Sequence, residues 1–339
     1  MALFRRSSDE STPLDGVDLV LADLDGVVYK GPDAIPHAVE SLNATAEDIR
    51  VGYITNNASR TDAAVAEHLS DLGLQVKPSD VVTSPQAAVR LLADHVAAGA
   101  NILVVGGDGL VDEVQKAGFS VTRSAEDDPA AVVQGFSPEV GWAQLAEASF
   151  ALQGRTDAER PWIATNTDWT IPVARGIAPG NGTLVSAVHT AVGRLPLVAG
   201  KPERAIFDEA VARFSAQKPL FIGDRLDTDI LGANRAGIAS VLVLTGIDGG
   251  KQLLSADADS RPTYILSDLR GLSEPYPETR TARNGAVTVR DATVTIEGNE
   301  VRIVSEGTDP VDLLRAACAA IWNSGRAIYG LDVPERLYG

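Results

Sequence analysis

From about residue 17 to residue 244, short runs of Val, Ile and Leu alternate with longer Ala-rich stretches whose apolar residues recur at helical spacing. This alternation is typical of βα units around a mostly parallel sheet. Two helices are predicted at 61–73 and 202–214, where a threonine and a proline stand at the first position. Strands are predicted at 18–23, 50–55, 101–106, 130–135, 161–165, 219–223 and 239–246.

The pattern changes after Leu272. Residues 273–285 are polar and proline-rich, which predicts a linker. Residues 286–304 then alternate apolar and polar positions, with an Asn-Glu turn after Gly298, and predict antiparallel strands. A helix is predicted at 309–325. A piece of about 55 residues is too small to be stable alone, so we expect it to dock on the rest of the chain.

Length and composition limit the class of protein. The 339 residues suffice for two domains or slightly more, and 45% hydrophobic with 5% aromatic residues fits a packed soluble α/β protein. A net charge of −17 argues against a nucleic-acid partner and against an anionic membrane surface. An anionic substrate would therefore need local positive charge from a metal ion, a few basic residues or helix N-termini.

The ends of the chain give two further expectations. The single cysteine, Cys318, lies on a predicted buried helix face, excludes an intramolecular disulfide and fits a reducing, cytoplasmic location. Residues 1–13 show neither a signal peptide nor a membrane span, so we expect a short disordered lead-in and no membrane insertion.

Ligands of parallel α/β sheets bind at the carboxyl ends of strands, which directs attention to the residues after each apolar run. The first run ends in Asp23-Leu24-Asp25-Gly26. Because side chains alternate along a strand, the two aspartates are expected on one side, where their repulsion calls for a divalent cation or a shared proton. Taken alone, the same residues also fit an ordinary turn.

Three other strand ends carry comparable groups. Thr55-Asn56-Asn57 offers donors for phosphate oxygens, or alternatively an N-cap. Lys201 precedes a helix that starts with proline, but a single lysine is usually a solvated surface residue. Asp224 ends a strand and Asp229 enters a helix, where isolated acids are often caps. None of these stretches decides the function by itself.

Together, the four stretches resemble the four motifs of the haloacid dehalogenase superfamily of phosphotransferases, over roughly residues 15–272. More than 100 residues separate Thr55 from Lys201, which is similar to the p-nitrophenyl phosphatase branch and implies an inserted α/β cap of the second type. Residues 163–188 resemble the cap pattern T-N-x-D, P and G-x-G of that branch. The C-terminal piece resembles half of an acetyltransferase fold, without its glycine-rich pyrophosphate loop, as in actinobacterial phosphatases of this kind.

The resemblance implies a fold and its division. We expect an α/β protein with a Rossmann-like core, an inserted α/β cap domain and a small C-terminal ββα extension. The core would comprise 15–84 and 196–272, the cap 85–195 and the extension 283–339. A glycine-rich stretch at Gly106 lacks the G-x-G-x-x-G spacing of a dinucleotide loop.

The resemblance also implies catalytic roles. Asp23 would be the nucleophile that forms an aspartyl phosphate, and Asp25 the acid and then the base. Lys201 would neutralise the transferring group and Asp23. Mg²⁺ would be held by the Asp23 carboxylate, the Asp25 main-chain carbonyl and Asp224, with Asp229 holding metal-bound waters.

Substrate contacts follow from the same resemblance. Gly26 would let the chain turn away from the phosphate, and Thr55, Asn56 and Asn57 would bind phosphoryl oxygens together with Lys201. Hydroxyls of the leaving alcohol would be recognised by a cap turn made of Asn166, Thr167 and Asp168, which by themselves also fit an ordinary turn.

The expected function is Mg²⁺-dependent hydrolysis of a small phosphomonoester, first of all glycerol 3-phosphate, with 2-phosphoglycolate and nucleoside monophosphates left open. Asp25 separates it from the metal-independent dehalogenases, which lack an acid there. A phospho-accepting signalling module is the alternative of another class, although an inserted cap has no purpose in a receiver. A binding protein that has lost catalysis would require a damaged motif. The sequence leaves open a homodimer through the cap or the tail.

Overall fold

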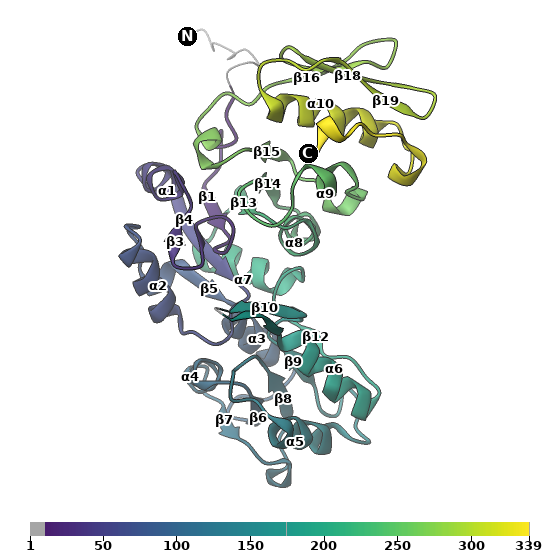
Figure 1. Ribbon diagram of the computed structural model, residues 1–339. Coiled ribbons are helices and arrows are strands. Elements are labelled where there is room, and N and C mark those ends of the chain that lie inside the picture. The colour runs from purple at the N-terminus through teal and green to yellow at the C-terminus, as the bar shows by residue number, and fades with distance from the viewer. Residues whose placement is uncertain (1–10, 174, 339) are drawn as a thin grey trace. The chain divides into compact units, whose positions relative to one another are not determined.

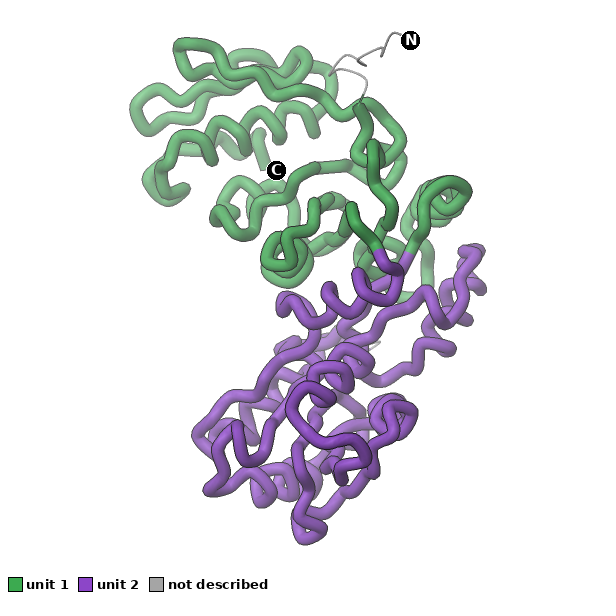
Figure 2. The backbone as a smooth tube through the Cα atoms, turned by 180° about the vertical axis from the view of Figure 1, so that it is seen from behind, with its two compact units in different colours: residues 1–51, 216–339 green, residues 52–215 purple. Residues whose placement is uncertain are grey.

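The computed structural model describes residues 11–173 and 175–338. Most of the predicted N-terminal lead-in, residues 1–10, lies outside the described residues. The chain forms two compact units, one made of residues 1–51 and 216–339 and the other of residues 52–215 (Figure 2). Among the described residues, no helix combines the length and the apolar character that a membrane crossing needs.

The first unit contains a parallel sheet in the order β15-β14-β13-β1. Its strands are almost wholly buried, and three of them confirm predicted strands, whereas β15 has only three residues and was not predicted. The elements around this sheet are β1 (Leu19–Ala22), β2 (Tyr29–Lys30), β3 (Asp33–Ala34), α1 (Ala38–Ala46), β13 (Pro219–Gly223), α8 (Leu231–Ala236), β14 (Ala239–Val243), α9 (Gly250–Leu254) and β15 (Tyr264–Leu266).

The C-terminal part of this unit is an antiparallel sheet in the order β16-β17-β18-β19, with helix α10 packed against it (Figure 1). Two details differ from expectation. The predicted linker contains the edge strand β16, and the turn between β18 and β19 is Gly298-Asn299, because Glu300 already pairs with Glu297. The bounds are β16 (Thr279–Thr281), β17 (Val287–Val289), β18 (Ala292–Glu297), β19 (Glu300–Ser305) and α10 (Pro310–Asn323).

The tail, residues 276–338, shares one apolar cluster with the neighbouring parallel sheet. Cys318 on α10 is 1% exposed, as predicted, and burial raises the pKa of its thiol. The tail therefore docks on the rest of its unit. The cluster joins tail residues such as Val289, Val294, Leu313, Leu314, Ile321 and Leu337 to Leu226, Ile230, Leu242, Leu253, Leu254 and Ile265.

A buried ion pair completes this docking. Asp312 on α10 is fully buried and accepts from Arg315 at 2.6 Å and from Arg290 at 3.2 Å. Arg315 Nε donates to the carbonyl of Ile265 at 3.0 Å, and its guanidinium lies 4.8 Å from the ring centre of Tyr276. The Tyr276 hydroxyl in turn accepts from the N–H of Ile265, so both main-chain groups of one β15 residue are held by the tail.

The second unit begins with the parallel pair β4 and β5. Thr61 and Thr83 cap α2 and α3, because each side chain accepts a main-chain N–H of the first helical turn. The elements are β4 (Arg50–Thr55), α2 (Asp62–Asp71), β5 (Val81–Thr83), α3 (Ser84–Ala93) and α7 (Arg204–Phe214). The predicted strand β4 and the predicted helices α2 and α7 are confirmed, whereas β5 and α3 were not predicted.

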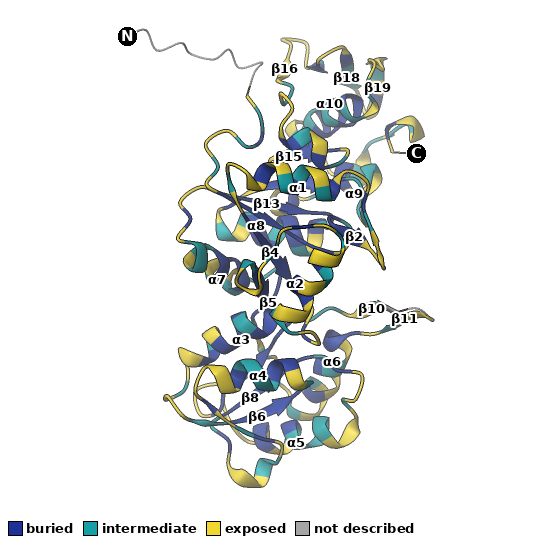
Figure 3. Cartoon of the chain, turned by 90° about the vertical axis from the view of Figure 1, so that its left-hand side faces the viewer, coloured by how far each residue is buried: buried dark blue, intermediate teal, exposed yellow. Residues whose placement is uncertain are grey.

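A five-stranded, wholly parallel sheet in the order β12-β9-β8-β6-β7 forms the remainder of this unit. Its middle strands are buried, while the outward faces of α4 and α5 are exposed (Figure 3). The inserted α/β segment is thus confirmed. Its elements are β6 (Asn101–Val105), α4 (Asp108–Lys116), β7 (Ser120–Thr122), β8 (Ala131–Gln134), α5 (Trp142–Leu152), β9 (Trp162–Ala164), β10 (Thr170–Val173), β11 (Gly176–Pro179), α6 (Asn181–Val192) and β12 (Leu197–Val198).

The exact domain limits remain a prediction. The sequence assigns 15–84 with 196–272 to the core, 85–195 to the cap and 283–339 to the extension. An independent test would be limited proteolysis, which cuts exposed connections between domains before it cuts packed strands.

Replacement of the buried acid in the tail should destabilise the protein. We expect Asp312→Ala to lower the free energy of unfolding by about 3 kcal/mol, because it leaves the guanidinium of Arg315 buried without its carboxylate. Urea denaturation measures this. As a control, Glu278→Ala removes the partner of Arg280 from an exposed pair and should change the same quantity by less than about 0.5 kcal/mol. Equal changes in the free energy of unfolding would show that the buried ion pair stabilises the protein no more than the exposed one.

Candidate active site

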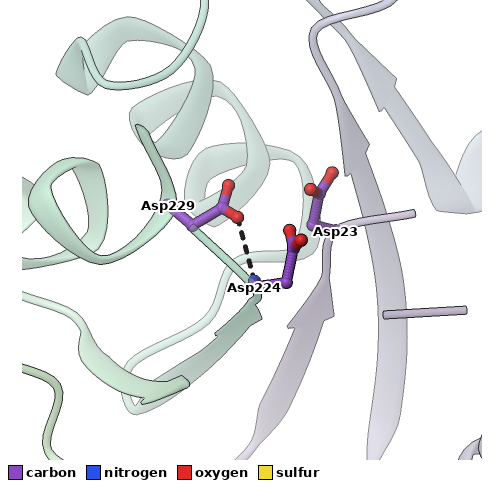
Figure 4. A group of neighbouring side chains, drawn as sticks. All are labelled: Asp23, Asp224 and Asp229. Atoms are coloured by element: carbon purple, nitrogen blue, oxygen red, sulfur yellow. Dashed lines mark hydrogen bonds between the residues drawn. The ribbon is translucent and has the colours of Figure 1, made fainter. Parts of the chain in front are cut away.

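Three aspartates meet at the carboxyl edge of the sheet in the first unit (Figure 4). Asp23 follows β1, Asp224 follows the adjacent strand β13, and Asp229 lies in the helical turn after it. One carboxylate oxygen of each residue lies within 4.8 Å of those of the other two. The residues are 9%, 1% and 0% exposed, so the sheet brings three acids together in a buried place.

Main-chain donors hold two of these acids. Asp229 Oδ2 accepts from the N–H groups of Asp224 and Arg225, both at 3.1 Å. Asp224 Oδ2 accepts from the N–H of Ile247 at 2.7 Å, and the Asp224 carbonyl accepts from the N–H of Asp248 at 3.1 Å. Residues 245–248, which we call the clasp loop, follow β14 and were not predicted as part of the site.

The turn after β1 leaves no space beside Asp224. Gly26 has φ +81°, and a Cβ on it would lie 2.2 Å from Asp224 Oδ2, so glycine is required both for the turn and for the approach. The hydroxyl of Thr245 in the clasp loop donates to the Gly26 carbonyl at 2.7 Å. The strand ends before Asp23, and Asp25, two residues further on, is exposed.

This donor set fits a hard divalent cation. Carboxylate oxygens are the ligands that such ions prefer, and buried like charges this close repel one another unless a cation or a proton relieves them. Gly26 and Gly246 leave the space beside Asp224 open, because a Cβ on either of them would lie within 2.2 Å of Asp224 Oδ2. The contribution of the Asp25 carbonyl stays a prediction.

Asp248 shows how the clasp loop is held on its other side. Its Oδ2 accepts from the N–H of Leu226 at 2.7 Å. Partial burial raises the pKa of Asp248 above the usual range, and the hydrogen bond from Leu226 opposes that rise. The clasp loop thus binds both Asp224 and the residue that begins the turn to Asp229.

In the second unit, the residues after β4 form a compact loop. Thr55 is 4% exposed, and its hydroxyl accepts from the N–H of Asn57 at 3.1 Å. The Asn57 side chain accepts from the N–H and the hydroxyl of Ser59 at 2.9 and 2.8 Å. This oxygen of Asn57 therefore shapes the loop, and a contact of Asn57 with a phosphate stays a prediction.

Asn56 is the centre of the polar contacts in this unit. Its Oδ1 accepts from the Lys201 N–H at 2.8 Å, and its Nδ2 lies 3.1 Å from both the Lys201 carbonyl and Asp168 Oδ1. The Asn56 carbonyl accepts from Ser84 at 2.7 Å and from Asn166 at 2.8 Å. Only an amide can donate and accept in this way, so Asn56 joins the lysine loop to the loop at 166–168.

The glycine before Lys201 is as constrained as Gly26. A Cβ on Gly200 would lie 2.5 Å from the Thr165 carbonyl and 2.6 Å from Asn56 Oδ1. Any larger residue would displace Asn56 from Lys201. Lys201 itself is 4% exposed and thus is not the solvated surface lysine that its sequence alone also fits.

The predicted cap turn is also ordered by close contacts. The N–H of Asp168 donates to Asn166 Oδ1 at 3.1 Å, and Asn181 Nδ2 donates to the Asn166 carbonyl at 2.7 Å. Cβ atoms on Gly180 and Gly182 would lie 2.2 and 2.3 Å from the carbonyls of Asp168 and Thr167, which explains the G-x-G pattern. The turn leaves Asp168 half-buried, with its neighbour Trp169 66% exposed.

Sequence reasoning missed residues in both units. Ser84 and Asn181 gave no signal, because their partners are main-chain carbonyls far away in the sequence. The clasp loop had a weak signal, since Thr245-Gly246 are the last two residues of a predicted strand, at its carboxyl end.

Comparisons with known proteins agree with these features. Residues 20–120 match the haloacid dehalogenase-like hydrolases, residues 198–272 a HAD-hydrolase-like family, and residues 286–332 a GCN5-related N-acetyltransferase like domain. The D-glycerol 3-phosphate phosphatase of Mycobacterium tuberculosis is 42% identical over 313 residues, which cover 91% of this chain and 87% of the relative.

Solved structures give the same result. The crystal structure of a glycerol phosphate phosphatase from M. tuberculosis in complex with magnesium matches with a TM-score of 0.84 and 39% identity, covering 96% of this chain and 95% of the other. The p-nitrophenyl phosphatase from Archaeoglobus fulgidus matches with a TM-score of 0.68 and 26% identity, covering 76% and 98%.

A parallel α/β sheet that collects acids at its carboxyl edge is the architecture of a phosphoryl-transfer enzyme. The chain belongs to the haloacid dehalogenase-like hydrolases, and it is an enzyme of the phosphatase class. The predicted Rossmann-like core, the p-nitrophenyl phosphatase-like branch and the acetyltransferase-like extension are confirmed.

Loss of the Asn56 side chain should impair turnover. Asn56→Ala removes the hydrogen bonds that fix the Lys201 main chain, and displacement of this predicted catalytic lysine should cost about 10- to 100-fold in kcat. Hydrolysis of p-nitrophenyl phosphate measures the effect. The control Asn101→Ala alters an amide in the inserted sheet and should retain kcat within about twofold. An Asn56→Ala enzyme with unchanged kcat would show that Lys201 does not depend on this amide.

Proposed function

We propose that this phosphatase hydrolyses a small phosphomonoester through an aspartyl-phosphate intermediate on Asp23. The observation that carries the proposal is the meeting of Asp23, Asp224 and Asp229 within 4.8 Å at the ends of two adjacent strands. A carboxylate nucleophile splits a difficult hydrolysis into two easier displacements.

In the first step, an oxygen of the Asp23 carboxylate attacks phosphorus and the ester P–O bond breaks. Asp25 in its acid form gives its proton to the leaving alkoxide oxygen, so that the alcohol departs neutral. Asp25 is two residues from Asp23 and exposed, which suits a group that must reach the leaving alcohol. The products of this step are the alcohol and an aspartyl phosphate.

In the second step, a water molecule attacks the phosphorus of the aspartyl phosphate. Asp25, now a carboxylate, takes a proton from this water, and the bond between phosphorus and Asp23 breaks. Inorganic phosphate is released and the Asp23 carboxylate is restored. Asp25 ends the cycle protonated, as it began.

Positive charge for the phosphoryl group comes from two sources in the proposal. Lys201, together with Thr55, Asn56 and Asn57, binds the phosphoryl oxygens, and the ammonium compensates charge in the transition state. Asp23, the Asp25 carbonyl and Asp224 would hold Mg²⁺, with Asp229 next to them. When bound, Mg²⁺ supplies charge neutralisation between the acids and the phosphate. A protein of net charge −17 needs this local compensation.

For the substrate we propose glycerol 3-phosphate. The names of the M. tuberculosis relative and of the protein in the related crystal structure support this choice, because the chain covers most of both. Asn166, Thr167 and Asp168 provide polar groups suited to the hydroxyls of a small leaving alcohol. 2-Phosphoglycolate and nucleoside monophosphates are the competing substrates, and a panel of phosphate esters assayed with Mg²⁺ and with EDTA decides among them.

The remaining partner assignments belong to the same proposal. We propose a cytoplasmic enzyme whose only substrate class is small phosphate esters, without a nucleic-acid partner. The single, buried cysteine supports the cytoplasmic location, and the strong negative charge argues against a nucleic-acid partner. Whether two copies of the chain associate is decided by sedimentation of the purified protein.

Replacing the proposed nucleophile should abolish turnover. Asp23→Asn keeps the size of the side chain but removes the attacking carboxylate, so kcat should fall by at least about 1,000-fold. The circular dichroism spectrum should not change, because Asp23 is not part of the apolar core. An Asp23→Asn enzyme that retains substantial Mg²⁺-dependent hydrolysis would refute the assignment.

Asp168 should affect the natural ester more than an artificial one. Asp168→Ala is expected to lower kcat/KM for glycerol 3-phosphate about tenfold more than for p-nitrophenyl phosphate, which has no hydroxyls to recognise. Asp168→Asn is the matched variant, since its amide oxygen can still accept from Asn56 Nδ2. Equal losses on both substrates would remove Asp168 from substrate recognition and leave it a purely structural residue.

A further inference from the structure

The clasp loop sets the position of Asp224 within the first unit. It supplies the N–H of Ile247 to the carboxylate and the N–H of Asp248 to the carbonyl of that residue. Gly246 approaches so closely that a Cβ would lie 1.9 Å from Asp224 Oδ2. A shift of this loop by a fraction of an ångström would therefore move a proposed metal ligand.

The clasp loop has little apolar anchoring of its own. Ile247, its large apolar side chain, is 70% exposed. The loop continues directly into α9 (Gly250–Leu254), and a helix of five residues is not stable in water without tertiary packing. Leu253 and Leu254 are 0% and 2% exposed and belong to the apolar cluster that includes the tail. The position of the loop thus depends on how α9 is packed.

The tail contacts the first residue of α9. A Cβ on Gly250 would lie 3.2 Å from the Leu337 carbonyl, 3.2 Å from Tyr338 Cα and 3.4 Å from Leu314 Cδ1. Leu314 is on α10, and Leu337 lies in the helical turn Glu335–Leu337 near the end of the chain. Helix α10 packs along α9 and is fixed to β15 through Arg315. Two segments of the tail therefore enclose the start of α9.

We propose that the C-terminal extension is a positioning element for the metal site. The tail holds α9, α9 holds the clasp loop, and the clasp loop holds Asp224 in the geometry that binds the cation. The inference rests on the proposed role of Asp224 as a metal ligand. It assigns the acetyltransferase-like extension a task in the phosphatase itself, through packing, and needs no second substrate.

Substitutions at Gly250 test the proposal on the full-length chain. Gly250→Ala and Gly250→Leu place increasing bulk against Leu337 and Leu314 without altering any residue of the three-aspartate cluster. Mg²⁺ binding is measured by titration calorimetry without substrate, below the melting temperature of every variant. We expect the Kd for Mg²⁺ to rise with the size of the new side chain, by at least about fivefold for Gly250→Leu.

Two further variants make the result decisive. Gly249→Ala is the matched control, because a Cβ there has only Gln252 Oε1 within 4 Å, at 3.9 Å, and it should keep the Kd of the unaltered protein. Leu314→Ala removes the contact from the tail side and should raise the Kd in the same direction as Gly250→Leu, so it decides the matter if that variant does not fold. Folded variants of Gly250 and Leu314 with unchanged Mg²⁺ affinity would overturn the proposal. An unaltered protein that binds no Mg²⁺ would instead refute the metal site on which the proposal rests.

Discussion

The structure depends on the cost of holding three acids together away from water. Asp23, Asp224 and Asp229 have carboxylate oxygens within 4.8 Å of one another and are almost fully buried. Like charges at such distances repel strongly, and burial adds to the cost. Main-chain N–H groups donate to the carboxylates of Asp224 and Asp229, which offsets part of this cost.

The close packing of the three acids also explains the glycines around them. Gly26 and Gly246 approach Asp224, and Gly223 approaches Asp229, so closely that a Cβ on any of them would overlap the neighbouring aspartate. Room for donors and for a cation is thereby reserved at the edge of the sheet. Each glycine loses more backbone conformational entropy on folding than another residue would. Burial of the apolar strands on either side offsets this loss.

In the second unit, a neutral side chain, the amide of Asn56, connects the polar loops. Asn56 accepts from the Lys201 N–H and lies within hydrogen-bonding distance of the Lys201 carbonyl and of Asp168. A carboxylate at this position could not donate, and it would repel Asp168. An amide is therefore the group that can tie the lysine loop, the loop after β4 and the turn at 166–168 into one body. The Asn56 side chain is thereby engaged within the protein, and a contact of Asn56 with a phosphate stays a prediction.

The sequence by itself determined the strand that precedes Asp23, the strands that end in Thr55 and Gly223, the inserted α/β segment and the family. Those features are local: an apolar run followed by a polar residue places that residue at the carboxyl edge of a parallel sheet, whatever lies around it. The three-aspartate cluster needs one further fact, the adjacency of β1 and β13, which the structure shows.

The tertiary structure alone decided which groups hold these residues. Asn56 and Lys201 are 145 positions apart, Thr245 and Gly26 are 219 apart, and no periodicity in the chain records such partners. The edge strand β16 within the predicted linker likewise forms only because β17 offers it a partner. Contacts of this kind depend on how packed elements meet, which is a property of the folded chain and not of any segment within it.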